Sequence, residues 1–202
     1  MSVAAKWSTW ATSTQDEDLE SELDDHQLME RVAEGDDGAF RLLVQRHTRS
    51  LHGHAVRMLQ NQSEAEEVVQ EAFVRLWKQA PSYRPEAKVK TFVHGIAHNL
   101  CIDRLRARKP RDDGALERLV ASDRTSGSLD ERERSDAVHA AVSALPERQR
   151  AALSLVHFEE LSNIEAAALL DVSVEALESL LARARRTLRE KLAELMSRGG
   201  GS

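Results

Sequence analysis

The segment LSNIEAAALLDVSVEALESLLARARR, residues 161–186, decides how the C-terminal part of this chain folds. Ser162 followed by Glu165 forms a capping box, which predicts that a helix begins immediately after Ser162. That helix breaks at Asp171, a residue type that tolerates a left-handed backbone, and Ser173 then caps a second helix. Two short helices joined by a tight turn are typical of a helix-turn-helix, whose second helix can enter the DNA major groove.

The buried and exposed faces of this helix pair differ in their chemistry. We expect the first helix to pack through a small apolar face formed by Ile164, Ala167, Ala168 and Leu170. In the second helix, apolar residues at three- and four-residue spacing predict a buried stripe: Val174, Leu177, Leu181, Ala184 and Leu188. The opposite face carries Glu178, Ser179, Ala182, Arg183, Arg185 and Arg186. The alternative interpretation is an ordinary helical hairpin with a solvated, arginine-rich face. DNA binding is favoured because the caps, the turn and the basic end of the second helix all occur in one register.

The composition of the whole chain favours an all-α protein. Of 202 residues, 41% are hydrophobic, 31% are charged and only 4% are aromatic. This length suits one medium domain or two small ones with their own cores. The single cysteine, Cys101, excludes an internal disulfide framework and suits a reducing cytoplasm. Since no apolar run approaches the roughly 18 residues of a membrane span and no signal-peptide core is present, we expect a cytoplasmic protein without membrane insertion.

The distribution of charge matters more than its sum. The net charge is −6, which at first argues against a nucleic-acid partner. Residues 1–37, however, carry eleven acids against two bases, whereas residues 84–111 carry eight bases against two acids. Residues 183–191 add five bases against one acid. Because affinity for phosphate depends on local charge, these two separate basic patches favour a nucleic-acid partner.

The hydrophobic pattern divides the chain into two helical domains joined by a flexible linker. We expect a disordered acidic tail (1–23), a first domain (24–110), the linker (111–134), a second domain (135–196) and a disordered end (197–202). In the first domain the pattern predicts helices at Asp25–Ala33, Asp37–Gln60, Ser63–Ala80 and Val89–Lys109. Ser63 with Glu66 forms a second capping box, which would open the third of these helices. In the second domain, helices near Ser135–Ala144 and Glu147–Phe158 precede the helix-turn-helix.

Three long segments, in this order, resemble a known family. They are AEEVVQEAFVRLW (Ala65–Trp77), TFVHGIAHNLCIDRLRAR (Thr91–Arg108) and LPERQRAALSLVHFEELSNIEAAALLDVSVEALESLLARARRTLR (Leu145–Arg189). The chain resembles the extracytoplasmic-function (ECF) class of bacterial RNA polymerase sigma factors, group IV of the sigma-70 family. The resemblance covers about residues 26–109 and 136–195. The chain differs from the common family pattern at Asp171, Glu178, Leu180, Phe92, His94 and His98.

The resemblance implies a fold, a function and partners. The first domain would be sigma region 2, which binds core RNA polymerase, reads the −10 promoter element and aids DNA melting. The second would be sigma region 4, which reads the −35 element. The expected partners are core polymerase, through its beta-prime clamp helices and beta flap, promoter DNA, and an anti-sigma factor that holds the chain inactive. A role in a stress response is expected, with no cofactor.

The resemblance and the residue types together name three sets of candidate site residues. The polymerase-binding set, an acid-and-amide face that suits a basic partner, is Glu66, Glu67, Gln70, Glu71 and Arg75. The −10 and melting set, in which Asn can read adenine and Arg can hold phosphate, is Tyr83, Arg84, Phe92, His98, Asn99, Arg104, Arg106 and Arg108. The −35 set is Ser173, Glu175, Glu178, Ser179, Arg183 and Arg186. Tyr83 could either stack against an unpaired base or pack within the protein.

Two other classes of function compete with this interpretation. A stand-alone helix-turn-helix regulator would leave the Ala65–Trp77 helix and the second basic helix unexplained. A metal-sensing interaction protein could use His94, His98 and Cys101, which fall at i, i+4 and i+7, but a fourth ligand is missing. The sequence shows no nucleophile–base pairing, phosphate loop or paired-carboxylate signature, so we expect neither an enzyme nor a metal site.

Overall fold

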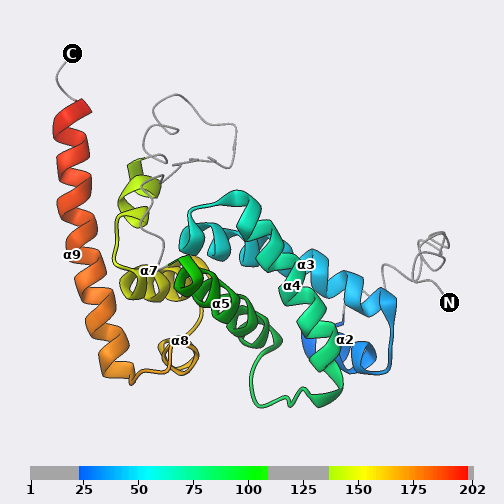
Figure 1. Ribbon diagram of the computed structural model, residues 1–202. Coiled ribbons are helices and arrows are strands. Elements are labelled where there is room, and N and C mark those ends of the chain that lie inside the picture. The colour runs from blue at the N-terminus through cyan, green and yellow to red at the C-terminus, as the bar shows by residue number, and fades with distance from the viewer. Residues whose placement is uncertain (1–22, 109–136, 200–202) are drawn as a thin grey trace.

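The computed structural model of the protein describes residues 23–108 and 137–199. Every regular element in these two ranges is helical, and the helices form two groups (Figure 1), which confirms the predicted all-α, two-domain fold. The predicted N-terminal tail, apart from its last residue, and the predicted linker lie outside the described ranges. No helix of the described ranges is long and apolar enough to cross a membrane.

The first domain contains the helices that the apolar spacing predicts. They are α2 (Asp25–Ala33), α3 (Asp37–Leu59), α4 (Gln62–Gln79), a 3-10 turn η2 (Ala80–Ser82) and α5 (Val89–Arg108). Their inward faces meet in one core, in which Leu43, Leu51 and Leu76 are fully buried. Burying a leucine of this kind stabilises a fold by about 1.5–3 kcal/mol, so this core supplies the rigid base for α4 and α5.

Local signals set most of the helix ends in the first domain. Gly35 ends α2 at a φ of 93°, where a side chain would be strained. The predicted capping box at Ser63 is wrong, because Asn61 caps α4 instead: its Oδ1 accepts from the backbone N–H of Glu64 at 3.0 Å. Gln60, at a φ of 54°, already turns the chain at the end of α3, so α4 begins before Ser63 is reached.

The second domain is built from four helical segments and one distorted turn. They are a helix at 137–143, α7 (Glu147–Leu153), the π-helical turn η3 (Ser154–Phe158), α8 (Asn163–Leu169) and α9 (Val174–Gly199). The regular helix predicted over 147–158 is therefore wrong in its last turn. The predicted disordered end at 197–202 is also wrong in part, because α9 continues to Gly199, beyond the other helices (Figure 1).

The helix-turn-helix forms as its local signals predict. Ser162 and Glu165 make the capping box of α8, Asp171 adopts a φ of 52°, and Ser173 Oγ accepts from the N–H of Ala176 at 3.2 Å. In α9, Leu177, Leu181 and Ala184 are buried, as the stripe predicts. The predicted inner face of α8 is corrected. Its buried residues are Ala166 and Ala167, whereas Ile164 is 73% exposed and Ala168 is exposed.

The two domains lie against each other rather than apart. Helix α7 and the turn η3 contact α3, and α8 contacts α5, so the second group of helices lies against the first (Figure 1). Ala151 of α7 is buried in the core of the first domain, and Leu170 packs against both cores. We call this contact the seam. It contains few apolar side chains and many polar ones, which are described below.

Candidate functional site

The face of α9 that the sequence predicts to read DNA is exposed. The predicted −35 residues, all exposed, are Ser173, Glu175, Glu178, Ser179, Arg183 and Arg186. The buried stripe on the opposite side holds this face outward, and Arg185 reaches back to His157, with Nη2 and Nε2 3.1 Å apart. An exposed helix face with polar residues in its first two turns and arginines from its third turn onward is compatible with a recognition helix in the major groove.

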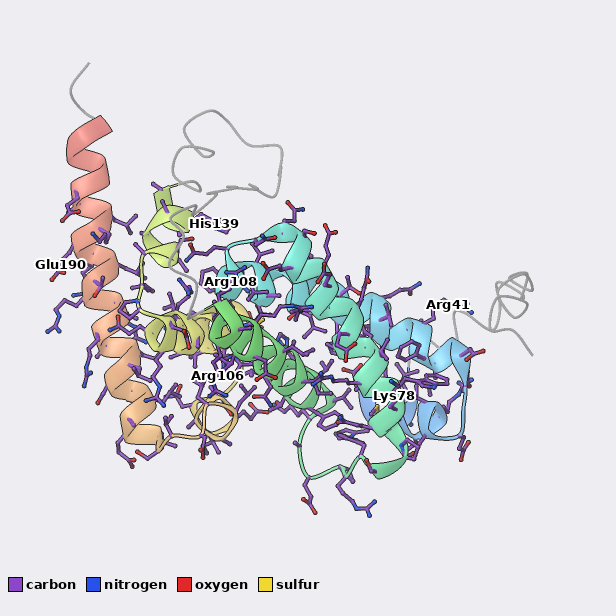
Figure 2. The ribbon with its side chains drawn as sticks, viewed as in Figure 1. Arg41, Lys78, Arg106, Arg108, His139 and Glu190 are labelled. Atoms are coloured by element: carbon purple, nitrogen blue, oxygen red, sulfur yellow. The ribbon has the colours of Figure 1, made fainter. Side chains whose placement is uncertain are left out.

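The predicted −10 residues of α5 do not share one face. Arg104 and Arg108 turn toward α4, where Arg104 Nη2 lies 3.2 Å from Glu67 and Arg108 Nη2 lies 2.6 Å from Glu64. Asn99 and Arg106 turn toward the second domain instead. Figure 2 shows Arg106 and Arg108 leaving the end of α5 on different sides. Positions two apart on a helix differ by about 200°, which separates these cations.

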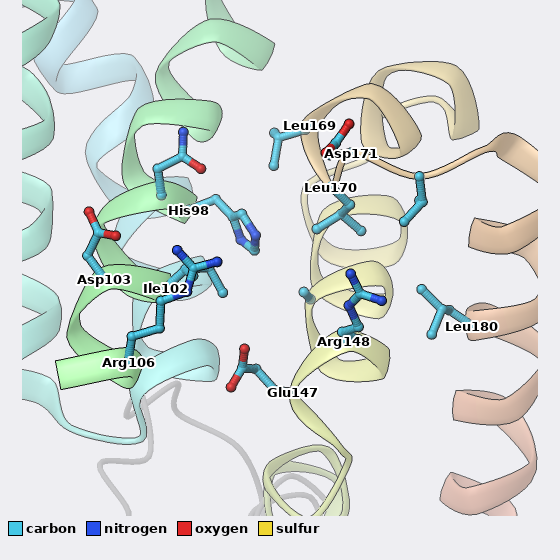
Figure 3. A pocket seen from close by; sticks show the side chains of 13 residues that line it. His98, Ile102, Asp103, Arg106, Glu147, Arg148, Leu169, Leu170, Asp171 and Leu180 are labelled. Atoms are coloured by element: carbon cyan, nitrogen blue, oxygen red, sulfur yellow. The ribbon is translucent and has the colours of Figure 1, made fainter. Parts of the chain in front are cut away.

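Asn99 and Arg106 line a pocket between the domains. The pocket has a volume of about 450 Å³, and Figure 3 shows its two walls. One wall is α5, with His98, Asn99, Ile102, Asp103 and Arg106. The other comprises α7, the turn of the helix-turn-helix and α9, with Glu147, Arg148, Ala151, Leu169, Leu170, Asp171, Val172 and Leu180. Two of the predicted −10 residues of α5 therefore face the second domain, including the turn of the helix-turn-helix, across one hollow.

The residues predicted to trap unpaired bases belong to a packed aromatic cluster. Tyr83 lies 5.3 Å from Phe92 between ring centroids, and its hydroxyl donates to the carbonyl of Ala87 at 2.5 Å. Tyr83 Oη is also 3.1 Å from His26 Nδ1, and burial raises the pKa of this tyrosine. Of the two roles considered for Tyr83, the structure shows packing. Arg84 beside it is exposed.

The three residues of the metal hypothesis do not form a binding site. His98 is buried, with Nδ1 3.4 Å from His54 Nε2, and burial lowers its pKa to about 4. Cys101 is buried in the first core, which raises the pKa of its thiol to about 12, the opposite of what a thiolate ligand needs. Within the described ranges, no group of three or more His, Cys, Asp and Glu residues could hold a metal ion. Buried His98 is also inaccessible to DNA in this arrangement.

The predicted polymerase-binding residues form one surface on α4. Glu66, Glu67 and Gln70 are exposed, and Glu71 and Arg75 pair at 2.8 Å. We call the α4 surface with these residues and Val74 the docking surface. A hollow of about 630 Å³ lies along it, completed by Leu100, Asp103, Arg104 and Ala107 of α5. Val74 is 45% exposed within this charged rim, which is the pattern of an apolar centre and a polar edge found in protein interfaces.

Residues that the sequence analysis missed hold the seam together. The carboxylate of Glu159, whose side chain is only 3% exposed, accepts from Ser50 Oγ and pairs with Arg57. Ser154 Oγ accepts from Arg57 Nε at 2.9 Å and lies 2.9 Å from His54 Nδ1. Burial raises the pKa of Glu159 and lowers that of Arg57, although each favours the charged form of the other. Ser50, His54 and Arg57 recur at helical spacing on α3, a polar stripe that could have signalled this contact.

Two family models match the chain where the two domains lie. Sigma-70 region 2 matches residues 43–111, and Sigma-70, region 4 matches residues 135–188. The first range holds α4 and α5, with the docking surface and the −10 face. The second holds the helix-turn-helix. Both surfaces described above therefore fall inside segments that sigma-70 proteins share.

Relatives and solved structures agree with these matches. The chain is 32% identical to the ECF RNA polymerase sigma factor SigW of Bacillus subtilis, over 83% of this chain and 96% of that protein. It is 34% identical to SigM of Mycobacterium tuberculosis, over 86% and 87%. CnrH in complex with the cytosolic domain of CnrY superposes with a TM-score of 0.64 at 26% identity, over 84% of this chain and 97% of that one. The sigma factor RpoE in complex with the anti-sigma factor NepR from Bartonella quintana superposes with a TM-score of 0.67 at 25% identity, over 76% of this chain and 96% of that one. The chain belongs to the ECF class of RNA polymerase sigma factors.

Proposed function

We propose that this chain directs core RNA polymerase to a set of promoters, with the docking surface on the polymerase and α5 and α9 on DNA. The observation that carries the proposal is the pairing of an exposed recognition helix with a hollowed acidic docking surface in one chain. A stand-alone helix-turn-helix regulator needs only α8 and α9. It would not need the docking surface, which lies on α4 of the other domain.

The promoter contacts divide between the two domains. On α9, Arg183 and Arg186 supply affinity for the −35 element, partly through phosphate, and Glu178 and Ser179 are placed to read base edges. On α5, Asn99 and Arg106 form the −10 face. Arg104 and Arg108 instead bind acids of α4 and support the docking surface.

An anti-sigma factor is the partner proposed to hold the chain inactive. Support comes from the solved structures, in which RpoE is bound to the anti-sigma factor NepR and CnrH to CnrY. A protein that gripped both domains would gain effective concentration from their covalent connection. Such a grip would keep the −10 and −35 surfaces from reaching a promoter together.

Transcription in vitro tests the proposal directly. Purified chain, core polymerase and genomic DNA fragments should yield transcripts with discrete start sites that neither protein produces alone. The mapped promoters should share a −35 and a −10 element. Transcripts that depend on core polymerase alone, or DNA binding without any effect on core polymerase, would overturn the assignment and favour the stand-alone regulator.

Replacing Arg183 by alanine should separate phosphate contact from base reading. Loss of one phosphate contact flattens the logarithmic salt dependence of promoter binding by about one unit, whereas loss of a base contact relaxes specificity at one position by roughly 1–3 kcal/mol. Fluorescence anisotropy at several salt concentrations would measure both. Arg46→Ala, which removes the same charge from the first domain, is the control. If Arg183→Ala behaves like that control, α9 is not in the proposed register on DNA.

A further inference from the structure

The first two turns of α9 carry acids and no base. The N-terminal residues of a recognition helix are the ones that contact base edges in the major groove. In this stretch the charged residues are Glu175 and Glu178, and both are exposed. The first arginine of α9, Arg183, comes only in the third turn. Because phosphates repel these two negative charges, contact between this end of α9 and DNA depends on what the bases supply.

The carboxylate of Glu175 is already used at the start of its own helix. Ser173 Oγ accepts from the backbone N–H of Ala176 at 3.2 Å and so caps α9. Hydrogen bonds from the backbone N–H of Glu175 itself and from the Ser173 hydroxyl hold the pKa of the Glu175 carboxyl below its usual value. The dipole of the helix also favours a negative charge in the first turn. Glu175 therefore stabilises the beginning of α9.

The hydroxyl of Ser179 is also engaged within the helix. Its Oγ donates to the backbone carbonyl of Glu175 at 3.0 Å, which uses the only proton that a serine hydroxyl can donate. The lone pairs of Ser179 Oγ can still accept from a base. A neutral hydroxyl, however, accepts a weaker hydrogen bond than a carboxylate does.

Glu178, in contrast, keeps its full capacity to accept hydrogen bonds. Within residues 23–108 and 137–199, its carboxylate has neither a hydrogen-bond partner nor an ion-pair partner. One turn further along the same side lies Ala182, which is exposed and small. No bulky side chain at that position keeps this side of the helix away from a base edge. Glu178 is therefore the side chain of the first two turns that is best placed to select a base.

The chemistry of a carboxylate restricts which base it can select. A carboxylate only accepts hydrogen bonds, and it leaves water at a high cost in free energy unless it meets a donor. In the major groove the donors are cytosine N4 and adenine N6, whereas guanine and thymine present acceptors. Adenine N6 lies beside the acceptor N7, which repels a carboxylate, but cytosine has no acceptor at this edge. Cytosine is therefore the base that suits Glu178.

We propose that Glu178 determines one position of the −35 element, where it accepts a hydrogen bond from the N4 amine of a cytosine. The proposal rests on the proposed sigma function and names the base that this side chain selects. The contact also works by exclusion, because at guanine or thymine the carboxylate would lose water and face an acceptor. Arg183 and Arg186 would supply affinity for phosphate, and Glu178 would lower the affinity for wrong sequences.

Selection from a promoter library tests the proposal. Holoenzyme assembled from the full-length chain and core polymerase would bind fragments of a mapped promoter in which every −35 position is randomised, and the bound fragments would be sequenced. The wild type should prefer cytosine at one position by about tenfold. Glu178→Gln should shift this preference to adenine, because an amide can pair with both N6 and N7. Glu178→Ala should tolerate all four bases there.

A matched variant separates base selection from a change in charge. Glu190, an exposed acid on a later turn of α9 (Figure 2), gives the control Glu190→Gln, which should keep the preference of the wild type. Circular dichroism checks that each variant retains its helicity. If the wild type shows no cytosine preference at any position, or if both Glu178 variants keep its preference, the proposal is overturned while core-dependent transcription still stands. Absence of core-dependent transcription in the wild type would instead overturn the sigma function.

Discussion

Reversing the charges of Glu67 and Glu71 together, as Glu67→Lys and Glu71→Lys, is expected to weaken binding to core RNA polymerase by about a hundredfold. Both carboxylates border the hollow of the docking surface. The hydrogen bond from Arg75 lowers the pKa of Glu71, so this group stays ionised in the neutral range. Reversal would turn two attractive contacts with a basic partner surface into repulsive ones. Affinity can be measured by titrating labelled core polymerase.

A matched control separates this effect from a general change in charge. Glu30 and Glu34 are exposed acids near the end of α2, and reversing both adds the same charge away from the docking surface. Circular dichroism should show unchanged helicity for both double variants. If the Glu67 and Glu71 variant co-purifies with core polymerase as well as the control does, the polymerase does not dock on this face of α4.

Acidification is expected to destabilise the protein through its buried histidines. Burial lowers the pKa of His94 to about 3 and that of His98 to about 4, and lowers the pKa of His54 as well. The unfolded chain takes up these protons near pH 6.5, so between about pH 6.5 and 4 it binds more protons than the folded chain. Stability therefore falls as the pH falls through this window, by roughly 2 kcal/mol each for His94 and His98 at pH 4.5.

Three carboxyl groups with shifted pKa values also contribute to the dependence of stability on pH. The pKa values of Asp25 and Glu165 are both lowered to about 2, so these groups add their own loss of stability as the pH falls from about 4.5 toward 2. The raised pKa of Glu159 acts in the opposite direction, because the folded chain then takes up that proton first. Urea unfolding between pH 7 and 4.5 would measure the slope. The double variant His94→Gln and His98→Gln should flatten it, and His52→Gln should not. An unchanged slope in the double variant would contradict this account.

Much of the fold follows from short segments of sequence, because capping and helical periodicity depend on residues three or four positions apart. Ser162 with Glu165, the left-handed Asp171 and the cap at Ser173 all form as predicted. The exposed face of α9 follows from the same spacing. The apolar residues of this helix form a stripe on one side only, so burying that stripe leaves the opposite side exposed. The error at Ser63 arose because Asn61 is an equally good cap two residues earlier.

Packing between elements decided what spacing left open. The spacing of α8 allows more than one buried face, and the path of α9 selects Ala166 and Ala167 while leaving Ile164 exposed. On α5, helical periodicity puts Arg104 and Arg108 on one side and Arg106 on the other, but only the structure shows that the first two pair with acids of α4 and that Arg106 faces the second domain.

The sequence by itself determined the two helical domains, the recognition helix and the acidic face of α4, but the tertiary structure alone decided how the domains meet. Ser50 and Arg57 contact Glu159 from more than a hundred positions away in the chain. In the sequence, the polar stripe of α3 has the character of a solvated face. It is buried because a carboxylate and a hydroxyl from the other domain complete its hydrogen bonds, and a polar side chain can leave water only where such partners are supplied.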